Sequence, residues 1–177
     1  RRDADAYDAI CDHLLVMDHA APGERPSVVG TYRILRGEVA AARGVPFYSA
    51  SEFDLAPLLA LDGGRRRLME VGRSCVREAY RSRSTLELLW HGLWTYARRH
   101  QVDVMLGCAS FEGSDAHSHR TALAHLHRHH LAPAAWRCRA LPHLAADVDL
   151  ADAETPDPRA GLRALPPLVK GYLRLGA

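Results

Sequence analysis

The sequence lacks the cysteine spacing of a disulfide framework or a zinc site. Its four cysteines, Cys11, Cys75, Cys108 and Cys138, are far apart and include no CxxC pair. Small disulfide-rich domains and zinc knuckles use closely paired cysteines, so neither class is indicated. Scattered free thiols are typical of a reducing compartment and predict a cytoplasmic protein.

A long apolar run and a large net charge are also missing. No stretch approaches the roughly 20 apolar residues that cross a bilayer. No signal peptide is recognisable, but the chain begins at Arg1 instead of Met, so this absence says little about targeting. The net charge is only +2, so overall electrostatics do not indicate a nucleic-acid partner. With 177 residues, 47% of them hydrophobic, the chain is long enough for one domain with a core.

The N-terminal third predicts a hairpin. Residues 14–17 are apolar and residues 28–35 are rich in branched and aromatic side chains, so each predicts a strand. The proline and glycine residues of 21–26 predict a turn between them. Residues 36–46 are polar and ambiguous, and residues 52–61 predict a short helix that ends at two glycines.

The central segment predicts a strand, a loop, a helix and a second strand. Residues 68–76 and 102–109 are the strands, and the apolar character of the second predicts a parallel strand buried on both faces. Ser84 and Glu87 have the spacing of a capping box. Six residues then form one apolar stripe at helical spacing, namely Leu86, Leu89, Trp90, Leu93, Trp94 and Ala97. Such a unit predicts an α/β fold.

The C-terminal part predicts a helix over 118–131, a strand over 136–141, an acidic surface loop over 142–158 and a last helix over 166–173. The spacing of His125 and His129 is that of two metal ligands on a helix, and His117 and His119 precede them. No carboxylate or cysteine completes a ligand set, so we expect a solvated histidine face and no metal site.

Two features of the central unit carry candidate chemistry. Glu70 lies inside an apolar strand, where a carboxylate is costly to bury unless it is paired or functional. It is therefore a candidate base or amine-binding group, or else one half of an ion pair with Arg33 or Arg73. Alternation along the strand places Glu70 on the face opposite that of Arg73.

The loop that follows this strand is the second feature. It has two arginines and three hydroxyl groups just before a helix N-terminus, which favours an anion such as a phosphate. Its residues are Arg81, Ser82, Arg83, Ser84 and Thr85. The loop has no Walker pattern, and an ordinary crossover loop with solvated arginines is the alternative.

These residues resemble a known family. The block Glu70 to Val76, followed by Tyr80-Arg81 and Leu89-Trp90, resembles the E-x-x-R-x-x-V block of acyl-homoserine-lactone synthases. It is more similar to their relatives, the ornithine N-acyltransferases of ornithine-lipid synthesis, which are often labelled haemolysin-like. Further similar segments are DAYD with CDHL near the start, GTYR at 30–33, GCASF at 107–111 and the tail at 165–176.

The resemblance implies a GNAT-type fold, with a mixed central sheet and helices on both faces, as a single domain over residues 1–177. It implies an acyl carrier protein with a 3-hydroxyacyl chain as donor and the α-amine of ornithine as acceptor. It implies no bound cofactor, and a long-chain product is compatible with peripheral contact at the inner membrane face. We expect family segments before Arg1 and beyond Ala177.

The resemblance also implies roles. Glu70 is the expected base. Asp5 and Asp8 either bind the ammonium groups of the acceptor or pair with Arg33 and Arg73. The acyl chain is expected along Cys108, Ala109, Ser110 and Phe111. The glycine-poor loop 81–85 suits the single phosphate of phosphopantetheine better than a coenzyme A pyrophosphate. Arginines 65–67, 77, 81 and 83 are either a docking face for the acidic carrier or a solvated basic rim. Another acceptor, including that of lactone-type signal synthesis, and a non-catalytic carrier-binding or lipid-binding domain are the alternatives.

Overall fold

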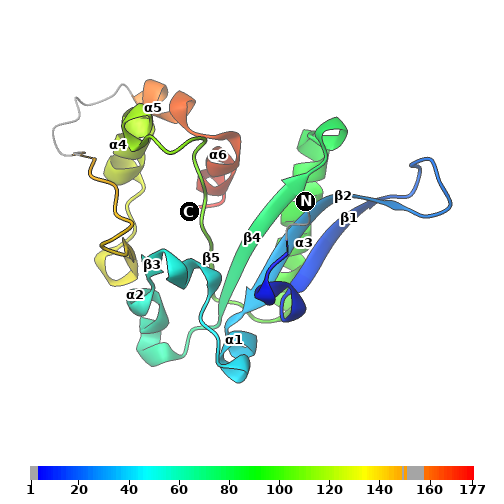
Figure 1. The fold of residues 1–177 in the computed structure, drawn as a ribbon, viewed down its shortest axis with the longest axis horizontal. Helices are drawn as coiled ribbons and strands as arrows, with labels where there is room; N and C mark the ends of the chain where they lie inside the picture. Colours follow the sequence, from blue (N-terminus) through cyan, green and yellow to red (C-terminus); the bar gives the residue numbers. More distant parts are fainter. Residues whose placement is uncertain (1–3, 149, 151–157) are drawn as a thin grey trace. The chain divides into compact units, whose positions relative to one another are not determined.

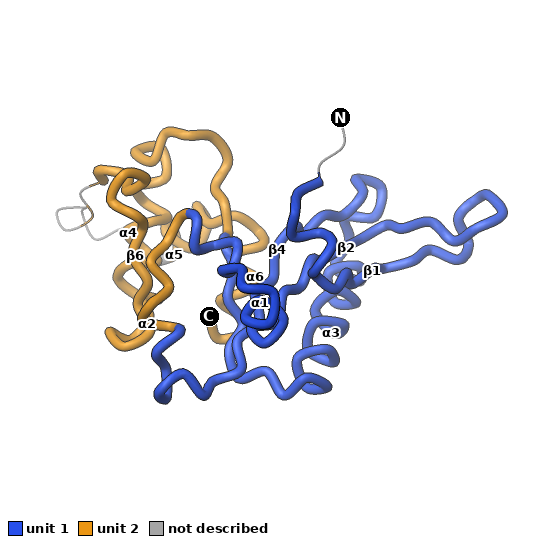
Figure 2. The backbone as a smooth tube through the Cα atoms, turned by 60° about the horizontal axis from the view of Figure 1, so that its bottom comes forward, with its two compact units in different colours: residues 1–51, 59–108 blue, residues 52–58, 109–177 orange. Residues whose placement is uncertain are grey.

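A computed structural model describes residues 4–148, 150 and 158–177 of the chain. The backbone divides into two compact units (Figure 2). The first comprises residues 1–51 and 59–108, and the second comprises residues 52–58 and 109–177. The single-domain organisation over residues 1–177 stays a prediction.

The first unit contains a four-stranded mixed sheet (Figure 1). Its strands lie in the order β1 (Asp12–Asp18), β2 (Ser27–Arg36), β4 (Leu68–Val76) and β5 (Val104–Leu106). The first three pair antiparallel, which confirms the predicted hairpin, and β5 runs parallel to β4. The parallel pairing was predicted, but β5 has three residues where a strand over 102–109 was expected.

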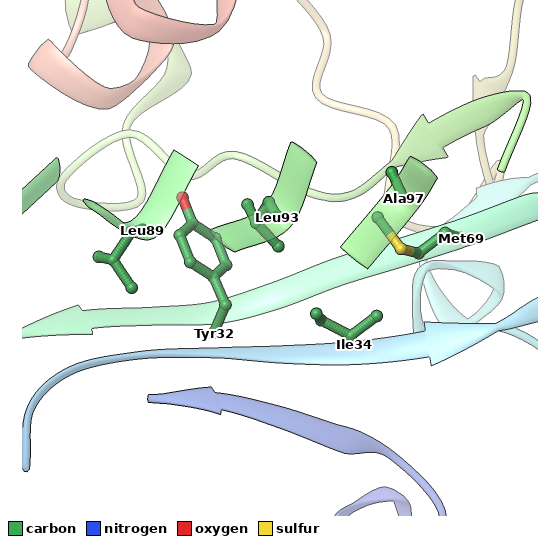
Figure 3. Close-up of a cluster of buried hydrophobic side chains, with 6 residues drawn as sticks. All are labelled: Tyr32, Ile34, Met69, Leu89, Leu93 and Ala97. Carbon is green, nitrogen blue, oxygen red and sulfur yellow. The ribbon is translucent and has the colours of Figure 1, made fainter. Parts of the chain in front are cut away.

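Helix α3 (Arg83–Arg99) covers one face of this sheet (Figure 3). Leu89, Leu93 and Ala97 of the helix pack against Tyr32, Ile34 and Met69 of β2 and β4. Buried positions recur every four residues because a straight helix presents that spacing to a flat sheet. The apolar stripe predicted for this helix is therefore wider than the buried face. Trp94, which was counted in the stripe, is 59% exposed.

The start of α3 differs from the prediction. Ser82 is the N-cap, and its hydroxyl accepts the backbone N–H of Thr85 at 3.3 Å. The expected capping box of Ser84 and Glu87 does not form, because Glu87 accepts a hydrogen bond from Arg83 one turn earlier at 2.7 Å. The helix dipole thus begins two residues earlier than the sequence pattern indicated.

The opposite face of the sheet carries shorter elements. Side chains that alternate with those of the core point there, among them Arg33 and Glu70. Arg33 finds its partners in the 3₁₀ helix η1 (Ala6–Ala9) and its N-cap Asp5, and Glu70 finds its partners in a second 3₁₀ helix, η2 (Tyr48–Ser51). Between β2 and η2 lies α1 (Gly37–Arg43), which fills the ambiguous segment and ends at Gly44 in a left-handed conformation with φ of 65°.

Short elements join the strands of the first unit. Before β4 lies η3 (Leu61–Gly64), and between β4 and α3 lies η4 (Glu78–Tyr80).

The predicted helix over 52–61 is instead the two-residue strand β3 (Phe53–Asp54) followed by the single turn α2 (Ala56–Leu59). Residues 53 and 54 are held extended by pairing with β6 (Arg139–Ala140), so one helix does not run through this segment.

The second unit is mainly helical. Its elements are η5 (Ala116–His119), α4 (Arg120–His129), η6 (Ala134–Trp136), β6 (Arg139–Ala140), α5 (Pro158–Ala164) and α6 (Pro167–Arg174). Strand β6 pairs with β3, so the strand predicted over 136–141 is shortened to two residues. Ala122, Leu165 and Val169 form the core, with Phe111 packed against them. The predicted acidic loop lies partly at 149 and 151–157, outside the described residues.

The histidines of α4 do not form a uniformly solvated face. His125 is only 6% exposed, and its ring lies 4.9 Å from that of His129 and 5.5 Å from that of His130. A Cβ atom on Gly161 of α5 would lie 2.6 Å from His125, so the two helices meet closely there. The expectation of a solvated face is therefore wrong for His125. In the described parts of the chain, no group of three potential ligands is placed to hold a metal ion.

Candidate active site

The site is built around Glu70, whose side chain is 6% exposed on the face of the sheet away from α3. Its Oε2 accepts the backbone N–H of Tyr48 at 2.6 Å. Its Oε1 accepts both the backbone N–H of Ser49 at 2.7 Å and the Ser49 hydroxyl at 2.5 Å. Three donors from one turn therefore hold a buried carboxylate in a fixed orientation.

Beside Glu70, a cluster of charges surrounds Arg33. The Arg33 guanidinium donates to Asp5 at 2.7 Å and to Asp8 at 2.8 Å, and its side chain is 7% exposed. It also lies 5.6 Å from the ring centre of Tyr7 and 5.4 Å from that of Tyr48. Both aspartates thus pair with arginine, and their role in binding the ammonium groups of the acceptor stays a prediction.

The electrostatics of this cluster follow from those contacts. The hydrogen bonds from Arg33 hold the pKa of Asp5 and that of Asp8 below their usual values. Burial, aided by the negative charge of Glu70, raises the pKa of Tyr7. The Tyr7 hydroxyl thus stays protonated and donates to the carbonyl of Pro46 at 3.2 Å, which connects η1 to the segment before η2.

A β-bulge on β4 brings Arg73 into the same cluster. Gly72 pairs with Arg33 and Cys75 pairs with Thr31, so β4 has one residue more than β2 between these pairs. Arg73 has a φ of 50°, and its guanidinium donates to Asp5 at 2.8 Å. The strict alternation predicted for this strand is interrupted here, because an extra residue changes the side to which the following side chains point.

The bulge matters chemically as well. An extra residue disrupts the regular pairing of the two strands, and bulges recur next to active sites. A non-glycine residue at positive φ costs on the order of 1 kcal/mol and is also concentrated at functional positions. The strand therefore has a local distortion two to three residues from the buried carboxylate.

The loop at the start of α3 has most of its side chains engaged. The Ser82 hydroxyl contacts the hydroxyl of Ser84 at 2.9 Å and that of Thr85 at 3.1 Å. Arg81 donates to the carbonyl of Val76 at 3.2 Å, and Arg83 pairs with Glu87 while 91% exposed. The five residues lie together at a helix N-terminus as predicted, and their anion-binding role stays a prediction.

The basic residues proposed for carrier docking fall into two groups. Arginines 65–67 precede β4, and Arg77, Arg81 and Arg83 follow it. A strand of nine residues separates the groups by roughly 30 Å at about 3.3 Å per residue. They therefore lie at opposite ends of β4.

The segment expected to hold the acyl chain is divided between the two units. Cys108 belongs to the first unit, and its thiol donates to the Ser49 hydroxyl at 3.2 Å, which connects it to Glu70. Gly107 lies so close to β4 that a Cβ atom would be 2.3 Å from the carbonyl oxygen of Val71. Ala109, Ser110 and Phe111 belong to the second unit, and Phe111 packs in its core. An acyl pocket along these residues stays a prediction.

Sequence reasoning missed the turn that holds Glu70. Tyr48 and Ser49 lie in a segment without a recognisable motif, 22 and 21 residues from Glu70. Gly44 and Pro46 are turn-forming residues, and they predict only that the chain changes direction shortly before residues 48–51. No signal indicated that the turn would meet β4.

Comparison with known proteins identifies the class. Residues 1–91 match the acetyltransferase (GNAT) domain family, which is more than half of the 177 residues. The chain therefore belongs to this family, and the GNAT-type fold expected from the motifs is confirmed. No solved structure was found to match the chain.

Named relatives place the chain more narrowly. It is 51% identical to the L-ornithine N(alpha)-acyltransferase of Agrobacterium fabrum, over all of this chain and 60% of that protein. It is 51% identical to the protein of the same name from Brucella abortus, over all of this chain and 63% of the relative. Against the Rhodobacter capsulatus protein of that name, the identity is 43% over 99% of this chain and 66% of the relative.

These relatives confirm the resemblance drawn from the motifs. The chain spans about three fifths of the length of the first two of them. No helix in the described ranges 4–148, 150 and 158–177 is long and apolar enough to cross a membrane.

Proposed function

We propose that the protein is an N-acyltransferase that moves a 3-hydroxyfatty acyl group from acyl carrier protein to the α-amine of ornithine. The observation that carries the proposal is the buried Glu70 carboxylate, which the η2 turn holds a few residues before the bulge of its own strand. The identity to relatives named L-ornithine N(alpha)-acyltransferase supports the acceptor.

The reaction is a direct attack. The neutral α-amine attacks the thioester carbonyl carbon, the C–N bond forms and the C–S bond breaks. Glu70 takes the proton that the amine loses, and the leaving sulfur of the carrier arm receives a proton. Backbone N–H groups of β4 stabilise the charge that develops on the carbonyl oxygen.

The site also accounts for the kind of acceptor. Asp5, Asp8 and Glu70 contribute three negative charges, and Arg33 and Arg73 contribute two positive charges, so the group carries about one net negative charge when all five are ionised. A cationic amino acid with a second ammonium group, such as ornithine, complements that charge.

The donor is a substrate rather than a resident cofactor. Arg81 and Arg83 lie beside the N-terminus of α3, where the helix dipole favours a phosphate. The phosphopantetheine arm of an acyl carrier protein brings one phosphate, and the carrier surface is acidic. We therefore propose carrier binding at this end of β4. The amphipathic product favours peripheral membrane contact, which co-sedimentation with anionic vesicles tests.

The deciding experiment uses the full-length protein with 3-hydroxyacyl carrier protein and an equimolar mixture of L-ornithine, L-lysine and L-homoserine. Products are separated by mass spectrometry. We expect acylated ornithine, with the acyl group on the α-amine. Acylation of a different amine would replace the acceptor in this proposal, and carrier binding without any acylated product would favour a non-catalytic role.

Two variants test the base. Glu70→Gln keeps the shape of the side chain but cannot take the proton, so we expect kcat to fall about 100-fold or more, with carrier binding unchanged. Glu24→Gln, in the exposed turn between β1 and β2, is the matched control and is expected to keep full activity. Equal activity of the two variants would reject Glu70 as the base.

A further inference from the structure

We infer that Ser49 is a positioning residue of the acyl transfer, because its hydroxyl fixes which oxygen of Glu70 receives the proton. This inference rests on the proposed function. It concerns a hydrogen-bonded chain that runs from Cys108 through Ser49 to Glu70.

The direction of the chain follows from counting protons. A serine hydroxyl has one proton to donate. The ionised carboxylate of Glu70 can only accept, so the Ser49 proton points to Oε1 at 2.5 Å. The Ser49 oxygen must then accept from the Cys108 thiol, whose sulfur lies 3.2 Å away. The chain is therefore polarised toward the carboxylate, and each bond strengthens the next.

The same count distinguishes the two oxygens of Glu70. A carboxylate offers about four positions to donors, two on each oxygen. Oε1 accepts both the N–H and the hydroxyl of Ser49, while Oε2 accepts only the N–H of Tyr48. Among the described contacts, the remaining acceptor position thus lies on Oε2. We assign the proton of the attacking amine to this oxygen, from which it passes to the leaving sulfur.

The position of Ser49 itself is fixed by its surroundings. The Ser49 side chain is 4% exposed. Phe47, two residues earlier, is 5% exposed and fixes the start of the turn in the core. The backbone N–H of Ala50 donates to the carbonyl of Phe47 at 3.0 Å, which closes η2. A buried hydroxyl in a rigid turn loses little freedom on binding the carboxylate, so it orients the base before substrate arrives.

Ser49→Ala removes the hydroxyl while the two backbone donors remain. We expect kcat to fall about tenfold or more and KM for the acyl carrier protein to stay within about twofold. Ser49→Thr keeps the hydroxyl and is expected to restore kcat.

Ser51→Ala is the matched control. Ser51 lies in the same turn, is exposed, and donates its hydroxyl proton to the carbonyl of Tyr48 at 2.7 Å. Among the described contacts it has none with Glu70, so the variant is expected to keep the wild-type kcat. The thermal unfolding of all variants is measured in parallel, and only variants that unfold as cooperatively as the wild type are compared.

A double-mutant cycle separates positioning from a general structural effect. If Ser49 acts through Glu70, Ser49→Ala in a Glu70→Gln background should change the residual kcat by less than about twofold. A further loss as large as that of the single variant would overturn the inference. So would a Ser49→Ala enzyme indistinguishable from Ser51→Ala in an active wild-type background. A wild-type protein that acylates no amine would instead reject the proposed function.

Discussion

Replacement of Arg33 tests whether the charge cluster stabilises the first unit. Arg33→Met keeps the aliphatic stem and removes a guanidinium that is 7% exposed and bound to two carboxylates. Breaking a fully buried pair by removing one partner costs about 3–5 kcal/mol. Asp5 and Asp8 are 25% and 35% exposed, so water recovers part of that loss. We expect a decrease of about 2–3 kcal/mol in the free energy of unfolding.

Urea unfolding followed by tryptophan fluorescence measures the effect. Trp90 and Trp94 lie on α3 in the first unit, so the experiment uses a Trp136→Phe background to remove the signal of the second unit. With a typical slope of 1–3 kcal/mol per molar urea, the midpoint should fall by about 1–2 M. The control Arg83→Met removes a 91% exposed partner and should change stability by less than about 0.5 kcal/mol. Equal effects of the two variants would refute the reasoning.

The pH dependence gives an independent check. The pKa of Asp5 is lowered in the folded protein, chiefly by the hydrogen bond from Arg33. Its contribution to stability is therefore complete above its ordinary value of 3.8 and is lost as the pH falls through the folded-state pKa. In Arg33→Met, the loss of stability at acid pH should be smaller, because protonation then relieves the repulsion between the carboxylates of Asp5 and Asp8. An unchanged acid limb would show that Arg33 does not set it.

Three further outcomes are expected. In urea unfolding, Ser82→Ala should destabilise the first unit by about 1 kcal/mol and Ser84→Ala by less than about 0.5 kcal/mol, because only Ser82 caps α3. A larger loss in Ser84→Ala would favour the capping box of Ser84 and Glu87 instead. Gly107→Ala should cost about 1–3 kcal/mol in the same assay, since its Cβ would meet the carbonyl of Val71 at 2.3 Å. Burial and two neighbouring histidines lower the pKa of His125 below 6.5. The contribution of His125 to stability should therefore be complete above pH 6.5 and decline as the pH falls through the folded-state pKa. Thermal unfolding at pH 5.5 and 7.5 measures this, and His125→Asn should reduce the difference between the two unfolding temperatures.

The regular elements were largely readable from sequence. Branched and aromatic residues predicted the β1–β2 hairpin and β4, and the apolar periodicity of residues 83–99 predicted α3. These elements are long or strongly patterned, so local preference and burial agree. Short segments were misjudged, because residues 52–61 and 136–141 have their conformations set by the pairing of β3 with β6, a contact between distant residues.

Residue types and motif order by themselves determined the class of protein, the candidate base Glu70 and the likeness to ornithine N-acyltransferases, because these depend on local pattern. Only the tertiary structure decided which contacts each group makes. It placed the η2 turn against Glu70, so that Ser49 and Tyr48 bind the carboxylate. It also placed the bulge that brings Arg73 to Asp5. Contacts across more than 20 residues and the register of a bulged strand depend on packing, which no local pattern encodes.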